Sequence, residues 1–406
     1  MATTPTIPLF KVYMNPTVKK AVNKVLYSGY IGEGEKVKEF EHNLSAYFRY
    51  TSSTSTIVTC NSATSAEHMI YNMLKKPAKF TTYYEYGALL KNWSGLDGNS
   101  EVISTPLTCT ATNWPILHNG LKLVWADIDP TTMNICLDSV KEKINEHTRI
   151  ITIVHWGGYP VDLDRLNKIV HDAEKKYGTT ILIVEDAAHA FGSKYNGYNV
   201  GFTGNLTTFS TQAIKHITTV DGGFLVSPFH EFTERAKLVR WYGIDRNLPR
   251  TDFRCEQDIP EIGFKFHMND INATIGIENL KMAHEIIGWH KLNGQTYNSK
   301  LVNIPGLTQL ENSPKAESAY WLYTIRVEDR HNFMKKLSAA GIASSRVHER
   351  NDKHSGLAEY EKAGKLITSE LPNLDIVCND MVCIPVGWWV SPKEIDYIIN
   401  TIKSGW

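Results

Sequence analysis

The chain has 406 residues, 42% of them hydrophobic, and its 43 basic and 43 acidic side chains balance. This balance excludes the basic excess expected of a nucleic-acid-binding protein, and no apolar run reaches the length needed to cross a bilayer. With neither a secretion signal nor a C-x-x-C pattern among six cysteines, we expect a cytoplasmic protein with free thiols, no metal site, and no nucleic-acid or membrane partner.

Apolar runs of strand length alternate with segments of helical periodicity between residues 55 and 227. This alternation predicts βα units and an α/β domain with a mainly parallel sheet between helices. In residues 161–177, Asp162 is placed to cap a helix whose apolar stripe includes Leu166 and Ile169. Residues 76–100 fit neither period and should leave the sheet. The seven expected strands are residues 56–59, 101–104, 122–126, 150–154, 181–184, 206–209 and 223–226.

After Phe266 the pattern becomes helical over more than twenty residues without a proline. It predicts a long linking helix over residues 266–300, between a large domain of residues 1–265 and a smaller C-terminal α+β domain of residues 301–406. In the smaller domain we expect strands at 323–327 and 382–385 and helices at 331–340 and 392–402.

Reactive side chains follow two neighbouring strands of the predicted sheet. The run at 181–184 ends on Glu185 and Asp186, which places a carboxylate where open α/β sheets bind their ligands. The next strand leads to Ser210 and then to Lys215, whose apolar neighbours favour a desolvated amine with a lowered pKa. Pyridoxal phosphate needs such a set: an amine for a Schiff base, a carboxylate for the pyridine nitrogen and donors for the phosphate.

A candidate anion site lies where the first strand gives way to a helix. Residues 61–65 have the sequence NSATS. Hydroxyls and free amides at a helix N-terminus bind anions. The alternative is that Ser62 or Thr64 only caps the helix. The lysine and aspartate further along the chain favour a phosphate site.

Ordered motifs extend over nearly the whole chain, among them NSATSAEH, EDAAHAFGSKYNG, FSTQAIKHITTVDGG and HMNDINATIG. In these motifs the chain resembles the sugar-nucleotide aminotransferases of the DegT/StrS type, pyridoxal-phosphate-dependent enzymes of the aspartate aminotransferase fold type. The resemblance implies that Lys215 forms the Schiff base with pyridoxal 5'-phosphate, that Asp186 pairs with the pyridine nitrogen and that His189 lies near the phenolic oxygen. It further implies phosphate contacts from Ala63, Thr64 and Ser210, and a pyridoxamine 5'-phosphate form in the half-reaction.

Three positions depart from the family pattern. In the family, an aromatic residue at the position of Cys109 often stacks on the cofactor ring. Trp114 or a residue of segment 76–100 is an alternative candidate for that role. Lys265 stands where an asparagine often reaches the phosphate of the neighbouring subunit, and a lysine can serve that anion as a point charge. Ala63 replaces a glycine, which makes a positive φ less favourable there. The resemblance also implies a homodimer with shared active sites.

The activity implied by the resemblance is amino transfer from an amino acid, chiefly glutamate, to a nucleotide-linked 4-keto-6-deoxyhexose in amino-sugar and glycan biosynthesis. The alternatives are a sugar 3-dehydratase, a branch in which histidine replaces the lysine, and a regulatory homologue without activity. The presence of both Lys215 and Asp186 favours the transaminase. The expected substrate contacts are Tyr30, His348, Arg350 and Trp388. The alternative is that the loop is merely solvated and the tryptophans only pack in the interior. Residues 240–247 have the same ambiguity.

Overall fold

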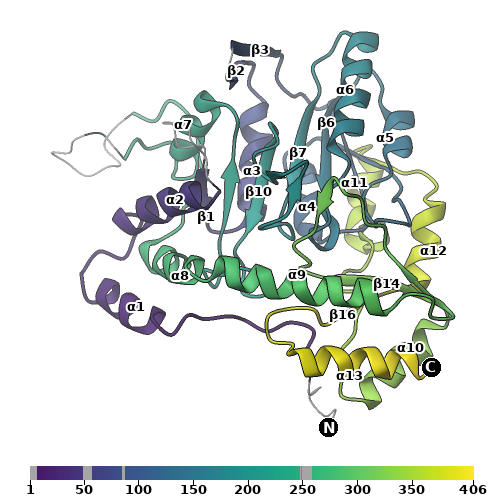
Figure 1. Cartoon of the computed structure of the whole chain (residues 1–406). Coiled ribbons are helices and arrows are strands. Elements are labelled where there is room, and N and C mark those ends of the chain that lie inside the picture. Colours follow the sequence, from purple (N-terminus) through teal and green to yellow (C-terminus); the bar gives the residue numbers. More distant parts are fainter. Residues whose placement is uncertain (1–6, 49–56, 85–86, 247, 249–257) are drawn as a thin grey trace.

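A central eight-stranded sheet organises the fold (Figure 1). The computed structural model describes residues 7–48, 57–84, 87–246, 248 and 258–406. The strand order is β1-β11-β10-β7-β6-β4-β5-β15. Only β11 runs antiparallel to its neighbours β1 and β10, and the other described pairs of this sheet are parallel. The bounds are β1 Ile57–Cys60, β4 Glu101–Ser104, β5 Lys122–Trp125, β6 Thr148–Val154, β7 Leu182–Asp186, β10 Leu206–Ser210, β11 Gly223–Val226 and β15 Leu366–Ile367.

The sequence prediction of an α/β fold with a mainly parallel sheet is confirmed, and all seven expected strands form. Thr56, where the first was expected to begin, lies outside the described residues. The predicted strand number is wrong by one, because β15 from the C-terminal part of the chain pairs in parallel with β5. A strand of two residues carries no measurable alternation, so sequence periodicity could not detect it.

Helices cover both faces of the sheet. Adjacent residues of β4 enter different cores: Val102 packs with apolar residues of α3 (Ala63–Leu74) and α4 (Thr110–His118), whereas Ile103 packs with those of α5 (Leu137–Lys143) and α6 (Leu163–Tyr177). This alternation is the pleat of a strand buried on both faces. Asp162 caps α6 as expected, accepting a hydrogen bond from Arg165 N at 3.1 Å.

Two helices replace the single long helix predicted for residues 266–300. Helix α8 spans Asp270–Leu280 and helix α9 spans Ala283–Lys300. At the break, Met282 N bonds to Asn279 O, a tighter turn than the α-helical one. The Asn279 side chain is bound by distant segments, since its Nδ2 donates to Thr218 O at 2.8 Å. Apolar spacing continues through the break, so periodicity did not reveal it.

The C-terminal part forms a second sheet of strands β12, β14 and β16, with helices packed on it. Its expected strands and helices are confirmed, and each end lies within one residue of the predicted position. In Figure 1, α9 crosses the view between the strands of the central sheet and α13. The bounds here are β12 Leu307–Gln309, β14 Tyr323–Val327, α10 Arg330–Ala339, α11 Ala358–Lys362, α12 Pro372–Asp380, β16 Met381–Ile384 and α13 Pro392–Lys403. The domain boundaries proposed from the sequence stay predictions.

The remaining elements surround these two sheets. The described residues of segment 76–100 leave the central sheet, as expected, and β2 and β3 within them pair as an antiparallel two-stranded sheet. The described cysteines are free thiols, and Cys255 lies outside the described residues. In the described ranges, no helix combines the length and apolar character needed to span a membrane, and no cluster of His, Cys, Asp and Glu is arranged to hold a metal ion. These elements are α1 Val18–Leu26, α2 Glu35–Tyr47, β2 Ala78–Tyr84, β3 Gly87–Trp93, β8 Lys194–Tyr195, β9 Tyr198–Asn199, β13 Ala316–Glu317 and α7 His230–Val239.

Candidate active site

Asp186 is the last residue of β7, and its side chain is almost fully buried. Its Oδ2 accepts a 2.6 Å hydrogen bond from Thr112 Oγ1 on α4. Its Oδ1 accepts a 2.9 Å bond from the backbone N–H of Ala188. These two hydrogen bonds fix the position of the carboxyl group. The end of β7 therefore presents an oriented carboxylate.

Lys215 lies in the turn after β10 and is half-buried. Burial lowers the pKa of its amine to about 8, although the nearby Asp186 and Cys109 act in the opposite direction. Its Nζ lies 3.6 Å from the centroid of the Trp321 ring. An amine with this pKa is partly unprotonated at neutral pH, so it is available as a nucleophile and as a proton acceptor.

Two histidines and a tryptophan adjoin this amine. His189 is buried and stacks on Trp321 with a centroid distance of 3.9 Å. Its Nδ1 accepts a long hydrogen bond, 3.4 Å, from Gly157 N, so the proton of the neutral ring is on Nε2. The rings of His189 and His348 are parallel, 5.8 Å apart.

Both imidazoles stay neutral at physiological pH. Burial, reinforced by the charge of Lys215, holds the pKa of His189 well below its ordinary value. The same two causes lower the pKa of His348 to about 4. The neutral rings offer polar contacts without adding positive charge next to the lysine amine.

The start of α3 forms a cradle beside the end of β10. Ser62 is the N-cap of α3, and its Oγ accepts from Ser65 N at 3.0 Å. The first N–H groups of a helix, here those of Ala63 and Thr64, have no partner within the helix. Ser210 pairs in register with Gly223, where an added Cβ would lie 2.3 Å from Ala63 N. Only glycine allows this close approach of strand and helix, which places the Ser210 end of β10 next to the free amides.

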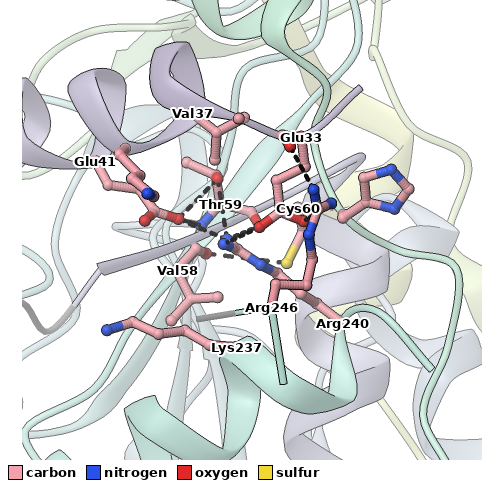
Figure 2. Close-up of polar contacts among 12 residues, drawn as sticks. Glu33, Val37, Glu41, Val58, Thr59, Cys60, Lys237, Arg240 and Arg246 are labelled. Atoms are coloured by element: carbon pink, nitrogen blue, oxygen red, sulfur yellow. Dashed lines mark hydrogen bonds and ion pairs between the residues drawn. The ribbon is translucent and has the colours of Figure 1, made fainter. Parts of the chain in front are cut away.

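A buried ionic cluster fixes the strand that leads into this cradle (Figure 2). Arg240, just after α7, pairs with Glu41 Oε1 at 2.5 Å through Nη1 and with Glu33 Oε1 at 2.7 Å through Nη2. Its Nη1 also donates to the backbone oxygen of Thr59 in β1 at 2.9 Å. The cluster therefore ties α2 and α7 to β1, immediately before the NSATS segment. Of the ambiguous residues 240–247, Arg240 thus has a structural role, and Asn247 lies outside the described residues.

Comparison with known proteins agrees with this arrangement. The model of the DegT/DnrJ/EryC1/StrS aminotransferase family matches residues 13–403. The chain belongs to this family. The resemblance seen in the sequence is thereby confirmed, and the chain is an aminotransferase homologue over nearly its whole length.

Solved structures of similar proteins share the fold. AtS13 from Actinomadura melliaura is 40% identical, with a TM-score of 0.89 and 100% of each chain covered. The sugar aminotransferase CalS13 from Micromonospora echinospora is 38% identical, with a TM-score of 0.88, covering 99% of this chain and 100% of that one. The putative sugar aminotransferase Spr1654 from Streptococcus pneumoniae, in its PMP form, is 26% identical, with a TM-score of 0.83 and 98% of each chain covered.

A curated relative carries a substrate in its name. The UDP-4-amino-4-deoxy-L-arabinose–oxoglutarate aminotransferase of Shewanella sediminis is 27% identical over 413 residues. The match covers 98% of this chain and 97% of the relative.

Some of the site residues proposed from the sequence lie close together in the structure of this aminotransferase. Asp186, Lys215, His189 and His348 lie around one point at the end of β7, and Ala63, Thr64 and Ser210 form the adjoining cradle. Cys109 precedes α4 as its N-cap residue and is close enough to influence the pKa of Lys215.

Other proposed contacts have partners of their own in the single chain. Arg350 is buried and already paired, since its Nε and Nη2 bond to Asp352 at 2.7 and 2.8 Å and its Nη1 contacts Asp375. In the single chain the guanidinium of Arg350 is therefore occupied by carboxylates, and its contact with a substrate stays a prediction. Trp388 packs edge-on against Tyr13 of the N-terminal segment, with ring centroids 5.2 Å apart. Trp114, the alternative to Cys109, contacts the ring of His354.

Lys265 and Tyr30 are both exposed in the single chain. The Lys265 amine lies 4.1 Å from the centroid of the Trp241 ring and 3.4 Å from His267 Nε2. The Tyr30 side chain is 82% exposed. The exposure of both side chains leaves them open to contact with a second subunit.

Sequence reasoning missed three residues that surround the core of the site: Trp321, Thr112 and Glu67. Trp321 lies just before β14, more than 100 residues from Lys215, and nothing local distinguishes it from a packing residue. Thr112 is one of several threonines in its segment. Glu67 carried a signal, because it is the only carboxylic residue in the otherwise apolar and polar stretch ATSAEHMIYNML.

Proposed function

We propose that this aminotransferase moves an amino group from an amino acid, glutamate by preference, to the keto group of a nucleotide-linked deoxysugar, with pyridoxal phosphate as cofactor. The observation that carries the proposal is that a lysine whose pKa is lowered to about 8 lies within electrostatic reach of an oriented aspartate at the end of β7. The names of the relatives support a sugar acceptor. A 4-keto-6-deoxyhexose is the leading candidate.

The residues present fit this cofactor. When bound, pyridoxal phosphate supplies an aldehyde that takes up the amine and a ring that delocalises negative charge from the substrate carbon. The Lys215 amine would bond to that aldehyde, and Asp186 would hold the proton at the ring nitrogen. His189 has its Nε2–H available for the phenolic oxygen. The amides of Ala63 and Thr64 and the hydroxyl of Ser210 would bind the phosphate.

Proton transfer at the substrate is assigned to Lys215. The Lys215 amine would serve as the general base that removes a proton from the carbon bearing the donor's nitrogen, and as the general acid that gives the proton back. A pKa near 8 lets the amine perform both steps close to neutral pH. Trp321 lies against the amine and, being buried, restricts the access of water to it.

The proposal includes a homodimer whose subunits share their active sites. Lys265 is an exposed cation at the turn that precedes α8, and its segment is anchored to the cradle through the 2.7 Å bond from Asn61 N to Phe266 O. Its amine would reach the phosphate bound by the other subunit. Tyr30 is exposed near the chain start and is the corresponding candidate for a contact with the partner's substrate.

The test is a spectrum followed by a substrate screen. Purified protein is mixed with pyridoxal phosphate, and the absorbance of the cofactor bound through Lys215 is compared with that of Lys215→Ala, which should lose this band. Glutamate is then supplied with UDP-, GDP- and dTDP-linked 4-keto-6-deoxyhexoses, and product mass and 2-oxoglutarate are measured. An amino sugar formed in step with 2-oxoglutarate is the expected result.

The same screen separates the alternatives. Loss of water from the sugar without gain of nitrogen would identify a dehydratase. Failure of the wild-type protein to bind the cofactor would overturn the enzyme proposal and favour a regulatory homologue.

A further inference from the structure

Glu67 is a buried carboxylic residue for which the reaction described above has no use. It lies in the second turn of α3, and the residue is 1% exposed. Its Oε1 accepts a 3.0 Å hydrogen bond from Thr208 Oγ1 in β10. Its Oε2 is buried and, within the described ranges, has no hydrogen-bond partner. Burying an ionised carboxylate oxygen without a hydrogen-bond partner costs free energy. The groups around Glu67 therefore decide whether it is ionised.

The surroundings of Glu67 place it behind Asp186. Thr208, its hydrogen-bond partner, is the register partner of Asp186 across the parallel strands β10 and β7. Burial, and then the charge of Asp186, raise the pKa of Glu67 well above its ordinary value, and Cys109 adds to this effect. From its own helix it faces Tyr71, whose pKa burial and Glu67 raise together.

The charge balance of this cluster requires a proton. The titratable groups with the largest influence on the pKa of Glu67 are acids, Asp186 first and then Cys109. Two ionised carboxylates side by side in a buried place repel each other, and one proton between them removes the repulsion. Asp186 already accepts from Thr112 and Ala188, whereas Glu67 Oε2 is unpaired, so the proton belongs on Glu67.

We propose that Glu67 is a positioning residue that stays protonated and donates its carboxyl proton to Asp186. This rests on the proposed function, in which Asp186 faces the ring nitrogen of the cofactor. A third donor makes Asp186 a weaker proton acceptor. The proton shared between Asp186 and the ring nitrogen therefore stays on the nitrogen, where it is needed for delocalisation of charge.

The first test uses the cofactor-free protein, because a proton held on Glu67 must be taken up on folding. Glu67→Gln keeps both hydrogen bonds: its amide oxygen can accept from Thr208 and its amide nitrogen can donate to Asp186. The unfolding equilibrium constant of the wild type, divided by that of E67Q, should rise about tenfold per pH unit between about pH 5 and pH 7. A flat ratio would show that Glu67 is ionised in the folded chain and would overturn the proposal.

The second test reports on the ring nitrogen. Wild type, E67Q and Glu67→Leu are loaded with pyridoxal phosphate labelled with ¹⁵N in the ring, and the ¹⁵N chemical shift is measured. E67Q should keep the protonated-nitrogen shift of the wild type, and E67L should move toward the unprotonated value. As a matched control, Glu101→Gln changes another buried carboxylic residue, one that accepts from Asn145, and should leave the shift unchanged.

The outcomes are distinguishable from a failure of the proposed function. If the wild type binds no labelled cofactor, the proposed function falls. If the wild type shows the protonated shift and E67L shows it too, only the role of Glu67 is refuted. An E67Q shift as strongly altered as that of E67L would also refute it, since the amide reproduces the neutral donor. If E67L does not fold, the pH dependence of unfolding of E67Q and wild type still tests the proposal.

Discussion

Lys215→Met should make the cofactor-free protein more stable at neutral pH, although it destroys the proposed catalytic amine. Burial lowers the pKa of Lys215 from 10.5 to about 8. This difference corresponds to a cost of about 3 kcal/mol for holding the charged amine in the folded chain below pH 8. Methionine removes that cost and keeps the apolar stem. It also removes the contact of the cation with Trp321, worth about 1 kcal/mol. We therefore expect a net gain of about 2 kcal/mol at pH 6.5.

The pH dependence gives the sign of the effect. A lysine with a lowered pKa in the folded state binds fewer protons than the unfolded chain between pH 8 and pH 10.5. Wild-type stability from this group therefore rises with pH across that window, and its deficit is complete below pH 8. The advantage of Lys215→Met should be constant from about pH 6 to pH 7.5 and should shrink toward pH 10.

Urea unfolding of both cofactor-free proteins at pH 6.5, 8 and 9.5, at one protein concentration, measures the difference. Lys265→Met is the matched control, because that lysine also lies against a tryptophan ring but is exposed. It should show no stabilisation that fades with pH. If Lys215→Met is less stable than wild type at pH 6.5, or if its gain is the same at every pH, the amine is not desolvated as described.

Three further substitutions test residues that support the site. Arg240→Met should cost about 3–5 kcal/mol, because Glu41 would be left as a buried carboxylate without its cation, while Glu33 would keep its 3.6 Å contact with Arg246. Adding Glu41→Gln should recover part of the loss in thermal unfolding. Lys265→Ala should raise the dissociation constant of pyridoxal phosphate several-fold at an unchanged melting temperature, and an unchanged affinity would count against the cross-subunit contact. Gly223→Ala should abolish cofactor retention or folding, since its Cβ would lie 2.3 Å from a backbone nitrogen of α3; normal binding would show that the strand and helix can separate.

The strands of the central sheet could be placed from sequence because each is a short apolar run followed by a helix of different period. The same logic placed Asp186, since a carboxylate directly after such a run must lie at the carboxyl edge of the sheet. Local patterns failed where long-range contacts decide. Strand β15 exists because it pairs with β5, and the α8–α9 helix break coincides with a side chain, that of Asn279, held by distant segments.

For the candidate site, too, local sequence patterns succeeded for some residues and failed where long-range contacts decide. Motif order identified Lys215, His189 and the NSATS cradle, but it could not tell that Arg350 is consumed by Asp352 and Asp375. A loop arginine has the same local sequence whether it meets a ligand or a neighbouring carboxylate. One of its partners, Asp352, is local, but the other, Asp375, is brought in by the packing of α12, which the sequence near Arg350 does not contain.

The sequence by itself determined the chemistry available at the end of β7, because an acid, an amine and a helix start in fixed order along alternating strands and helices can only meet at one sheet edge. The tertiary structure alone decided the environment that sets their protonation: Trp321 against Lys215, His348 parallel to His189, and Glu67 behind Asp186. Protonation depends on burial and on charges brought in from distant segments, and these exist only after the chain has packed.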